Sequence, residues 1–205
     1  MKKILIPIVM LFFLGNIFAQ EMMHTLAKDE RKSAIKYIKW TSKEMKKTLK
    51  GLSPAQLNFH EAADKWSIQD CLYHIAFSEG ALRGALDGAV AAPADPAAKA
   101  ELKATDEQIK NGVTDRTNKV KTAPPFEPQN TGFKSYDEAK TAFKTKRAAL
   151  IELIKTTQVD LRNHIVSLPF GNMDAYQMAL FIAGHSNRHT KQMQEVKMAS
   201  AYPKS

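Results

Sequence analysis

Cysteine is almost absent from this chain of 205 residues, in which Cys71 stands alone. A single cysteine cannot form a disulfide within the chain, so the fold must be stabilised by packing even in an oxidising compartment. Cys71 also lies far from the N-terminal apolar segment, where the lipid-modified cysteine of a lipoprotein would stand. The cysteine content therefore excludes a disulfide-built scaffold and a lipoprotein.

Long hydrophobic runs are equally scarce. One apolar stretch, Ile4 to Phe18, follows a short positively charged start and is shorter than the roughly 20 residues of a membrane-spanning helix. It ends at Ala19, a small residue that suits a signal peptidase. We predict a cleaved signal peptide at residues 1–19 and a helical domain at residues 20–205. The protein is then exported, periplasmic or secreted, with no stable membrane span; the alternative is that the segment stays as an anchor.

The net charge of +9 is basic, and basic proteins can bind nucleic acid or an anionic membrane surface. Here the lysines are scattered through helical patterns, often beside glutamates. An exported protein also rarely meets intracellular nucleic acid. We interpret the charge as a solvated surface and predict no nucleic-acid partner.

No run of alternating apolar and polar residues indicates a strand, and neither heptads nor an internal repeat is present. Apolar residues instead recur at helical spacing in four long segments. These segments cover approximately residues 24–49, 67–88, 135–156 and 174–199. The pattern predicts an all-α protein, an antiparallel four-helix bundle with extended connections.

The connections differ in character. Residues 89–98 are rich in alanine and proline and are predicted to form a loop. Residues 99–121 are polar and weakly periodic and should contain some helix. Residues 161–170 are predicted to be a short connector that packs over the end of the bundle.

Histidines provide the first indication of chemistry. His185 and His189 stand four residues apart on the last predicted helix, where both imidazoles lie on one face and can share a metal ion. Such a pair can equally be polar filling of a surface. His74 lies among apolar residues of the second predicted helix, so its ring needs a partner, for which a backbone carbonyl is the ordinary choice. The remaining histidines have no partner at helical spacing: His24, His60 and His164.

Two short motifs resemble the signatures of the DinB-like superfamily. The first comprises Trp66-Ser67-Ile68, then His74 and Glu79. The second is the stretch from Ala183 to His189, an H-x-x-x-H motif followed by Gln192. Gly51-Leu52-Ser53 also resembles the first connector of that family. The resemblance covers residues 31–198, and the order and spacing of the motifs make it specific.

The resemblance implies that His74, His185 and His189 bind one divalent metal ion, zinc, nickel or similar. Three protein ligands leave one position open, which is the pattern of catalytic rather than structural sites. Activities in the superfamily include bacillithiol and mycothiol transfer and a mycothiol-dependent isomerisation, and most members are described as hydrolases. Family members are often dimers, so the resemblance allows a homodimer, although the sequence shows no separable interface.

We therefore expect a metal-dependent hydrolase that uses a metal-bound water on a small-molecule substrate. Two alternatives are a thiol-dependent S-transferase of the same superfamily and a non-catalytic metal-binding helical module. Export weighs against the transferase, because its thiol substrates are intracellular. Ser186 and Asn187 lie between the two histidines, where metalloproteases of the His-Glu-x-x-His type carry a glutamate. The motif therefore does not fit a protease of that type.

Two neighbours could support the site. Asp70, four residues before His74, could orient its ring or close the helix cap with Ser67. Gln192, three residues after His189, could face the same cavity and offers a donor and an acceptor.

The other polar or aromatic neighbours are given structural interpretations. Trp66 is expected in the core, Cys71 to be buried and inert, and Glu79 to be structural or solvated. Arg188 is expected off the face of the histidines, where it could attract an acidic group. Residues 89–121 could cap the open end of a metal cavity or form a surface excursion.

Overall fold

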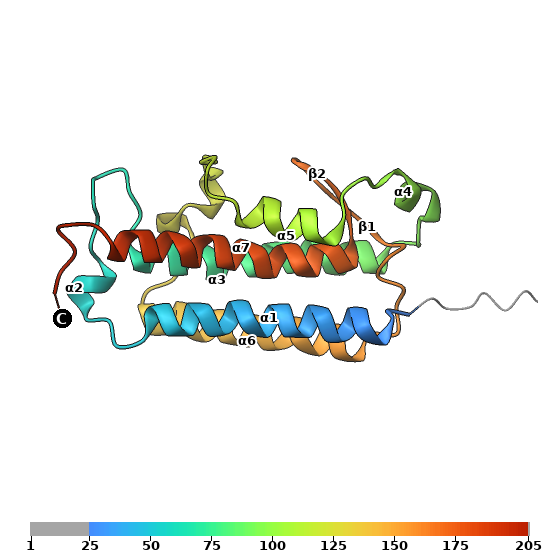
Figure 1. The fold of residues 1–205 in the computed structure, drawn as a ribbon, viewed down its shortest axis with the longest axis horizontal. Coiled ribbons are helices and arrows are strands. Elements are labelled where there is room, and N and C mark those ends of the chain that lie inside the picture. Colours follow the sequence, from blue (N-terminus) through green and yellow to red (C-terminus); the bar gives the residue numbers. More distant parts are fainter. Residues whose placement is uncertain (1–24, 205) are drawn as a thin grey trace, which may run out of the picture.

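Four long helices run side by side in the computed structural model, which describes residues 25–204 (Figure 1). They are α1 (Lys28–Leu49), α3 (Ile68–Ala91), α6 (Tyr136–Thr156) and α7 (Ala175–Lys197). The prediction of an all-α four-helix bundle is confirmed. The predicted signal peptide and His24 lie outside the described residues, and export stays a prediction. Within residues 25–204, no helix is both long and apolar enough to cross a membrane.

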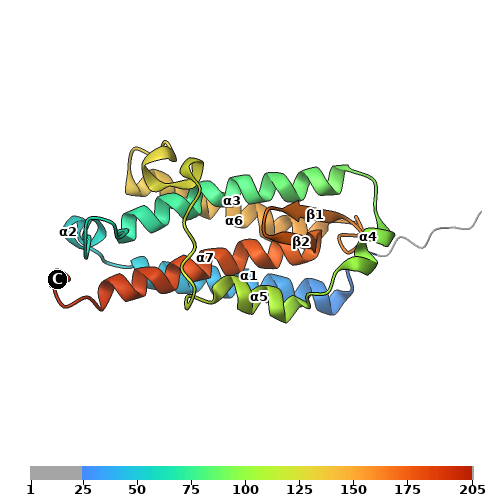
Figure 2. The same ribbon diagram turned by 90° about the horizontal axis from the view of Figure 1, so that it is seen from above.

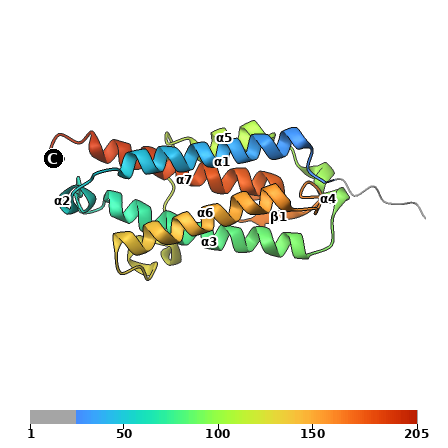
Figure 3. The same ribbon diagram turned by 90° about the horizontal axis from the view of Figure 1, so that it is seen from below.

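The bundle has a diagonal order. Helices α1 and α3 each pack against both α6 and α7. The first two long helices of the chain, α1 and α3, therefore stand at opposite corners of the bundle. Figures 1 and 3 show α1 running antiparallel to α6, and α3 antiparallel to α7. The other two neighbouring pairs, α1 with α7 and α3 with α6, run parallel. Parallel packing of α3 and α6 requires a connection that returns along the whole bundle, and residues 92–135 provide it.

That returning connection is more ordered than the sequence suggested. It contains α4 (Pro96–Glu101), α5 (Asp106–Thr114) and two 3₁₀ turns, η1 (Pro124–Phe126) and η2 (Pro128–Asn130). The prediction of some helix in residues 99–121 is confirmed. The prediction of a loop over residues 89–98 is wrong, because α3 continues to Ala91 and α4 begins at Pro96. Alanine favours helix, Pro96 suits a first helical position, and Asp95 caps it by accepting a hydrogen bond from Ala98 N at 2.8 Å.

A β-hairpin precedes α7, although the sequence pattern indicated no strand. Strands β1 (Ile165–Leu168) and β2 (Gly171–Asp174) pair antiparallel, with Val166 opposite Met173. Four residues per strand are too few to produce a visible alternation. Gly171 has φ 137°, which lets the chain reverse between the strands. The last residue of β2 then caps α7, since Asp174 accepts a hydrogen bond from Gln177 N at 2.7 Å.

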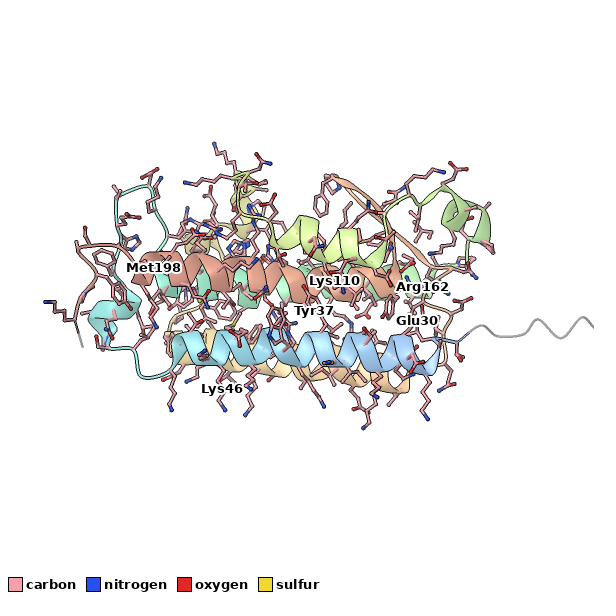
Figure 4. All side chains as sticks on the ribbon, viewed as in Figure 1. Glu30, Tyr37, Lys46, Lys110, Arg162 and Met198 are labelled. Carbon is pink, nitrogen blue, oxygen red and sulfur yellow. The ribbon has the colours of Figure 1, made fainter. Side chains whose placement is uncertain are left out.

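Helix α5 packs along the outside of α7 (Figure 2). Close packing depends on Gly184, because a Cβ at this position would lie 2.3 Å from Val113 Cγ1 and 3.1 Å from the Tyr37 hydroxyl. Figure 4 shows Tyr37 of α1 beside Lys110 of α5, and the Lys110 ammonium lies 5.5 Å from the centre of that ring. Helix α5 thus covers the turn of α7 that carries His185. The short helix α2 (Pro54–Leu57) lies at the opposite end of the bundle from the hairpin.

Arg162 ties the hairpin end of the molecule together. Its guanidinium binds Glu30 of α1 at 2.7 Å, Asp106 of α5 at 2.7 Å and Asp174 at 3.0 Å. Figure 4 shows Arg162 and Glu30 at that end. The ring of Tyr176 lies beneath the same guanidinium, at 4.0 Å. One partly buried arginine therefore positions the N-terminal ends of three helices, α1, α5 and α7.

The apolar core is divided into two clusters. One lies towards the hairpin and includes Ile38, Leu150 and Ile182, whereas the other lies towards α2 and includes Leu72 and Met193. Buried polar side chains occupy the level between them and come from all four long helices. They are Thr41, Glu79, Arg147, Ser186 and Thr190.

Candidate metal centre

Three imidazoles meet in the middle of the bundle. His74 projects from α3, and His185 and His189 project from α7, one helical turn apart. The Nε2 atom of His185 lies 3.2 Å from Nε2 of His74 and 3.2 Å from Nε2 of His189. His74 and His189 are buried and His185 is half-buried. Among the described residues these three form a group whose ligand atoms lie within 4.8 Å of one another.

The outer nitrogens of two rings are held by fixed acceptors. His74 Nδ1 lies 2.7 Å from the carbonyl oxygen of Phe126, and His189 Nδ1 lies 2.9 Å from Gln192 Oε1. Because both partners can only accept, each Nδ1 carries the proton and each Nε2 keeps its lone pair. Arg116 donates to the same Gln192 oxygen at 3.3 Å, which supports this orientation of the amide. Imidazole ligands of metals are commonly oriented in this way.

These rings fit a divalent cation better than they fit one another. His185 Nδ1 is buried without a hydrogen-bond partner in the described structure. If His185 carries its proton on Nε2, it can donate to only one of the two neighbouring lone pairs; if on Nδ1, three lone pairs face each other. A cation can accept the lone pairs of all three Nε2 atoms. Nitrogens about 2.0–2.1 Å from a tetrahedral zinc ion lie about 3.3 Å apart, close to the two separations of 3.2 Å.

Burial keeps the imidazoles neutral. It lowers the pKa of His74, with the hydrogen bond to Phe126 acting in the opposite direction. Burial, followed by the nearby charge of His74, lowers the pKa of His185 to about 3. Burial and the other two histidines lower the pKa of His189 well below its ordinary value. All three rings are therefore uncharged at neutral pH, the state in which imidazole binds a metal ion.

Aromatic rings enclose the cluster. Trp66 is half-buried, and its ring centre lies 5.0 Å from that of His74 and 5.8 Å from that of His189. Phe181 stacks parallel to His185 at 6.3 Å. The sequence interpretation of Trp66 as a core residue was incomplete, because its ring also forms a wall of the histidine site. His74 lies eight positions further along the chain, and nothing in that spacing by itself indicates contact.

Comparison with known proteins agrees with this geometry. The sequence of residues 37–193 matches the DinB superfamily. The chain belongs to the DinB superfamily. It is 29% identical over 150 residues, 73% of its length, to the uncharacterized protein YuaE of Bacillus subtilis (strain 168), of which the match covers 88%.

The fold of this DinB-superfamily protein also resembles that of a solved structure, YfiT from Bacillus subtilis. That protein is described as "a probable metal-dependent hydrolase with an unusual four-helix bundle topology". The TM-score is 0.53 at 10% sequence identity, over 88% of this chain and 93% of YfiT. The similarity establishes the fold.

Of the two residues predicted to support the site, one contacts a histidine of the cluster and the other caps a helix. Gln192 contacts His189, whereas Asp70 accepts hydrogen bonds from Ser67 N at 2.9 Å and Ser67 Oγ at 2.8 Å. Asp70 thus has the capping role that was one of its two expected roles, and the backbone of Phe126 orients His74 instead. Phe126 reaches α3 from the returning connection, 52 residues along the chain. No local pattern could have identified that contact.

Glu79 belongs to the buried polar layer rather than to the histidine cluster. Its carboxylate pairs with the guanidinium of Arg147 of α6, and both side chains are almost fully buried. Arg147 also donates to Ser186 Oγ at 2.7 Å and to Thr41 Oγ1 at 3.3 Å. Glu79 is therefore structural, as one of its two interpretations held. Ser186 precedes Asn187 and follows His185, so this layer fixes α7 at the level of the cluster.

Two clefts open beside the site. The smaller, of about 270 Å³, is lined by His189 and Gln192, and the larger, of about 620 Å³, lies next to it. Trp66 lines both, together with Val120 and Thr122 of the returning connection. That connection therefore helps to form the surroundings of the site, as one of its two expected roles held.

Proposed function

We propose that this protein is a divalent-metal-dependent hydrolase whose metal is held by Nε2 of His74, His185 and His189. The observation that carries the proposal is the convergence of three neutral imidazoles, with Nε2 of His185 lying 3.2 Å from Nε2 of each of the other two. Among residues 25–204, no fourth histidine, cysteine or carboxylate joins the group. A site with three protein ligands has room for water or substrate.

A divalent ion bound here would supply a Lewis acid and lower the pKa of a water molecule for attack on an electrophilic centre. The protein positions the histidine rings around that ion. The Phe126 carbonyl and Gln192 hold two rings in the ligating tautomer, and Trp66 forms a wall beside His189. The description of YfiT as a probable metal-dependent hydrolase supports the same reaction class by similarity of fold.

Metal content and hydrolysis test the proposal together. The mature protein should contain one divalent ion per chain by mass spectrometry. His189→Ala should lose the ion, whereas His60→Ala should retain it, because His60 lies outside the cluster. A panel of chromogenic esters, amides and phosphoesters should be hydrolysed by the wild type and not by His189→Ala.

The outcomes separate the alternatives. Absence of stoichiometric metal, or its retention after all three histidines are replaced by alanine, contradicts the proposed site. Metal without hydrolysis of any substrate class favours a non-catalytic binding module. Turnover that requires an added thiol favours the S-transferase.

A further inference from the structure

Helix α7 presents more than metal ligands to the smaller cleft. Positions 185, 188, 189, 192 and 195 form one stripe along the helix, because each has a neighbour in the set three or four residues away. Arg188 lies in this stripe and lines the same cleft as His189. Arg188 was expected off the face of the histidines, where it could attract an acidic group, and the structure places it in the cleft that His189 lines. Its guanidinium is half-buried and close to the ligand cluster along the helix surface.

Charges in this cleft are only partly matched. Arg116 is paired with Glu195, through two contacts of 2.6 Å, and Lys65 is paired with Asp64 at 2.8 Å. Within the described chain, by contrast, Arg188 has no carboxylate within 4.0 Å, and its guanidinium donates only to the backbone carbonyl of Asn118, at 2.7 Å. The exposed Lys119 and Glu61 also line the cleft, and neither has an ion-pair partner among residues 25–204.

The guanidinium of Arg188 is charged at neutral pH. It shares the cleft with Arg116, whose charge is matched by Glu195. A half-buried cation beside a second cation is stabilised by an anion, and guanidinium groups bind carboxylates and phosphates through parallel hydrogen bonds.

We infer that the cleft beside His189 binds the anionic group of a small-molecule substrate, a carboxylate or phosphate, through Arg188 with Lys119. The assignment of this anion as part of a substrate rests on the proposed function, although the anion site itself does not. The anionic group occupies the smaller cleft, and the adjoining cleft of about 620 Å³ across Trp66 has room for the remainder of a small molecule.

Titration with inorganic phosphate and with succinate tests the inference, by calorimetry on the protein as purified. Arg188→Gln should weaken binding of at least one probe about tenfold or more, because a hydrogen bond to a charged group is lost. Lys119→Gln should weaken it by a smaller factor, since that side chain is exposed. Lys144→Gln is the matched control: it removes one charge from the exposed face of α6 and should leave the affinity unchanged.

A fluorescence measurement locates the bound anion. The chain has two tryptophans, so Trp40→Phe leaves Trp66, which lines the cleft, as the only tryptophan. Addition of the bound probe should change its emission, and Arg188→Gln should shift the titration midpoint by the same factor as in calorimetry. Circular dichroism establishes that each variant is folded, and Arg188→Lys, which keeps the charge, should retain part of the affinity.

The result distinguishes this inference from the proposed function. If neither probe binds, or if Arg188→Gln and Lys144→Gln bind equally well, the anion site is contradicted. Binding that disappears on chelation and is insensitive to Arg188→Gln places the anion on the metal and also overturns the inference. If the protein contains no metal but phosphate binding still depends on Arg188, the anion site stands and the proposed hydrolase fails.

Discussion

Replacement of Arg147 by methionine tests the buried polar layer between the two apolar clusters. The substitution leaves the carboxylate of Glu79 without its partner, in a position where its side chain is 2% exposed. Removing one member of a buried ion pair costs about 3–5 kcal/mol of folding free energy. For a domain of this size, about 2–4 °C of melting temperature are lost per kcal/mol, so we expect a decrease of roughly 6–20 °C.

The loss should depend on pH. Burial raises the pKa of Glu79 from its ordinary 4.5 to about 7, against the opposing charge of Arg147. Without that charge the pKa rises further. Because the folded-state pKa lies above the unfolded one, the contribution of Glu79 is most favourable below about pH 4.5 and is lost as the pH rises through about 7 and beyond. The deficit of Arg147→Met should thus be smaller at about pH 5.5 than at about pH 8.

The double variant Glu79→Leu with Arg147→Met provides the decisive comparison. Replacing both members of a buried pair by apolar groups is often neutral or stabilising. Thr41 Oγ1 and Ser186 Oγ still donate to carbonyls of their own helices, at 3.0 and 2.9 Å, so their hydroxyls stay satisfied. Thermal unfolding followed by circular dichroism measures all variants, with Lys144→Met as the control for a lost surface charge. A double variant no more stable than Arg147→Met would refute the reasoning.

Three further predictions concern the site and its packing. Gln192→Leu should lower metal affinity about 10–100-fold, measured by competition with a chromogenic chelator, because His189 loses its orienting acceptor; unchanged affinity would contradict that role. Gly184→Ala should destabilise the fold, since overpacking against Val113 costs about 1–3 kcal/mol and better helix propensity returns up to about 1 kcal/mol. Adding Val113→Ala should restore the melting temperature relative to the single variant, and equal melting temperatures would argue against the contact. Burial raises the pKa of the Cys71 thiol, so a thiol reagent should label it only upon unfolding, and rapid labelling of the folded protein would contradict its burial.

Local spacing determined much of the architecture in advance. Apolar residues at helical intervals located all four long helices, because helix periodicity is a property of neighbouring residues. The cap formed by Ser67 with Asp70 was visible for the same reason. The pairing of His185 with His189 followed from four-residue spacing on one helix. The hairpin was missed because four-residue strands carry too little pattern, and the helical ends at Ala91 and Pro96 were missed because alanine and proline also mark loops.

Contacts between distant segments required the tertiary structure. The sequence placed His74 with the other two histidines only through its apolar setting and the resemblance to a family, whereas the packing of α3 against its neighbour α7 brings Nε2 of His74 to 3.2 Å from Nε2 of His185. The packing of η1 against α3 brings the Phe126 carbonyl to His74, and the packing of α6 against α3 brings Arg147 to Glu79, across 52 and 68 positions of the chain. Helical periodicity specifies which side chains share a face, but not which face of another helix they meet. Burial of apolar surface and the path of the returning connection decided which helix faces meet. They also decided which hydrogen-bond acceptors, aromatic rings and unpaired cation surround the candidate metal centre.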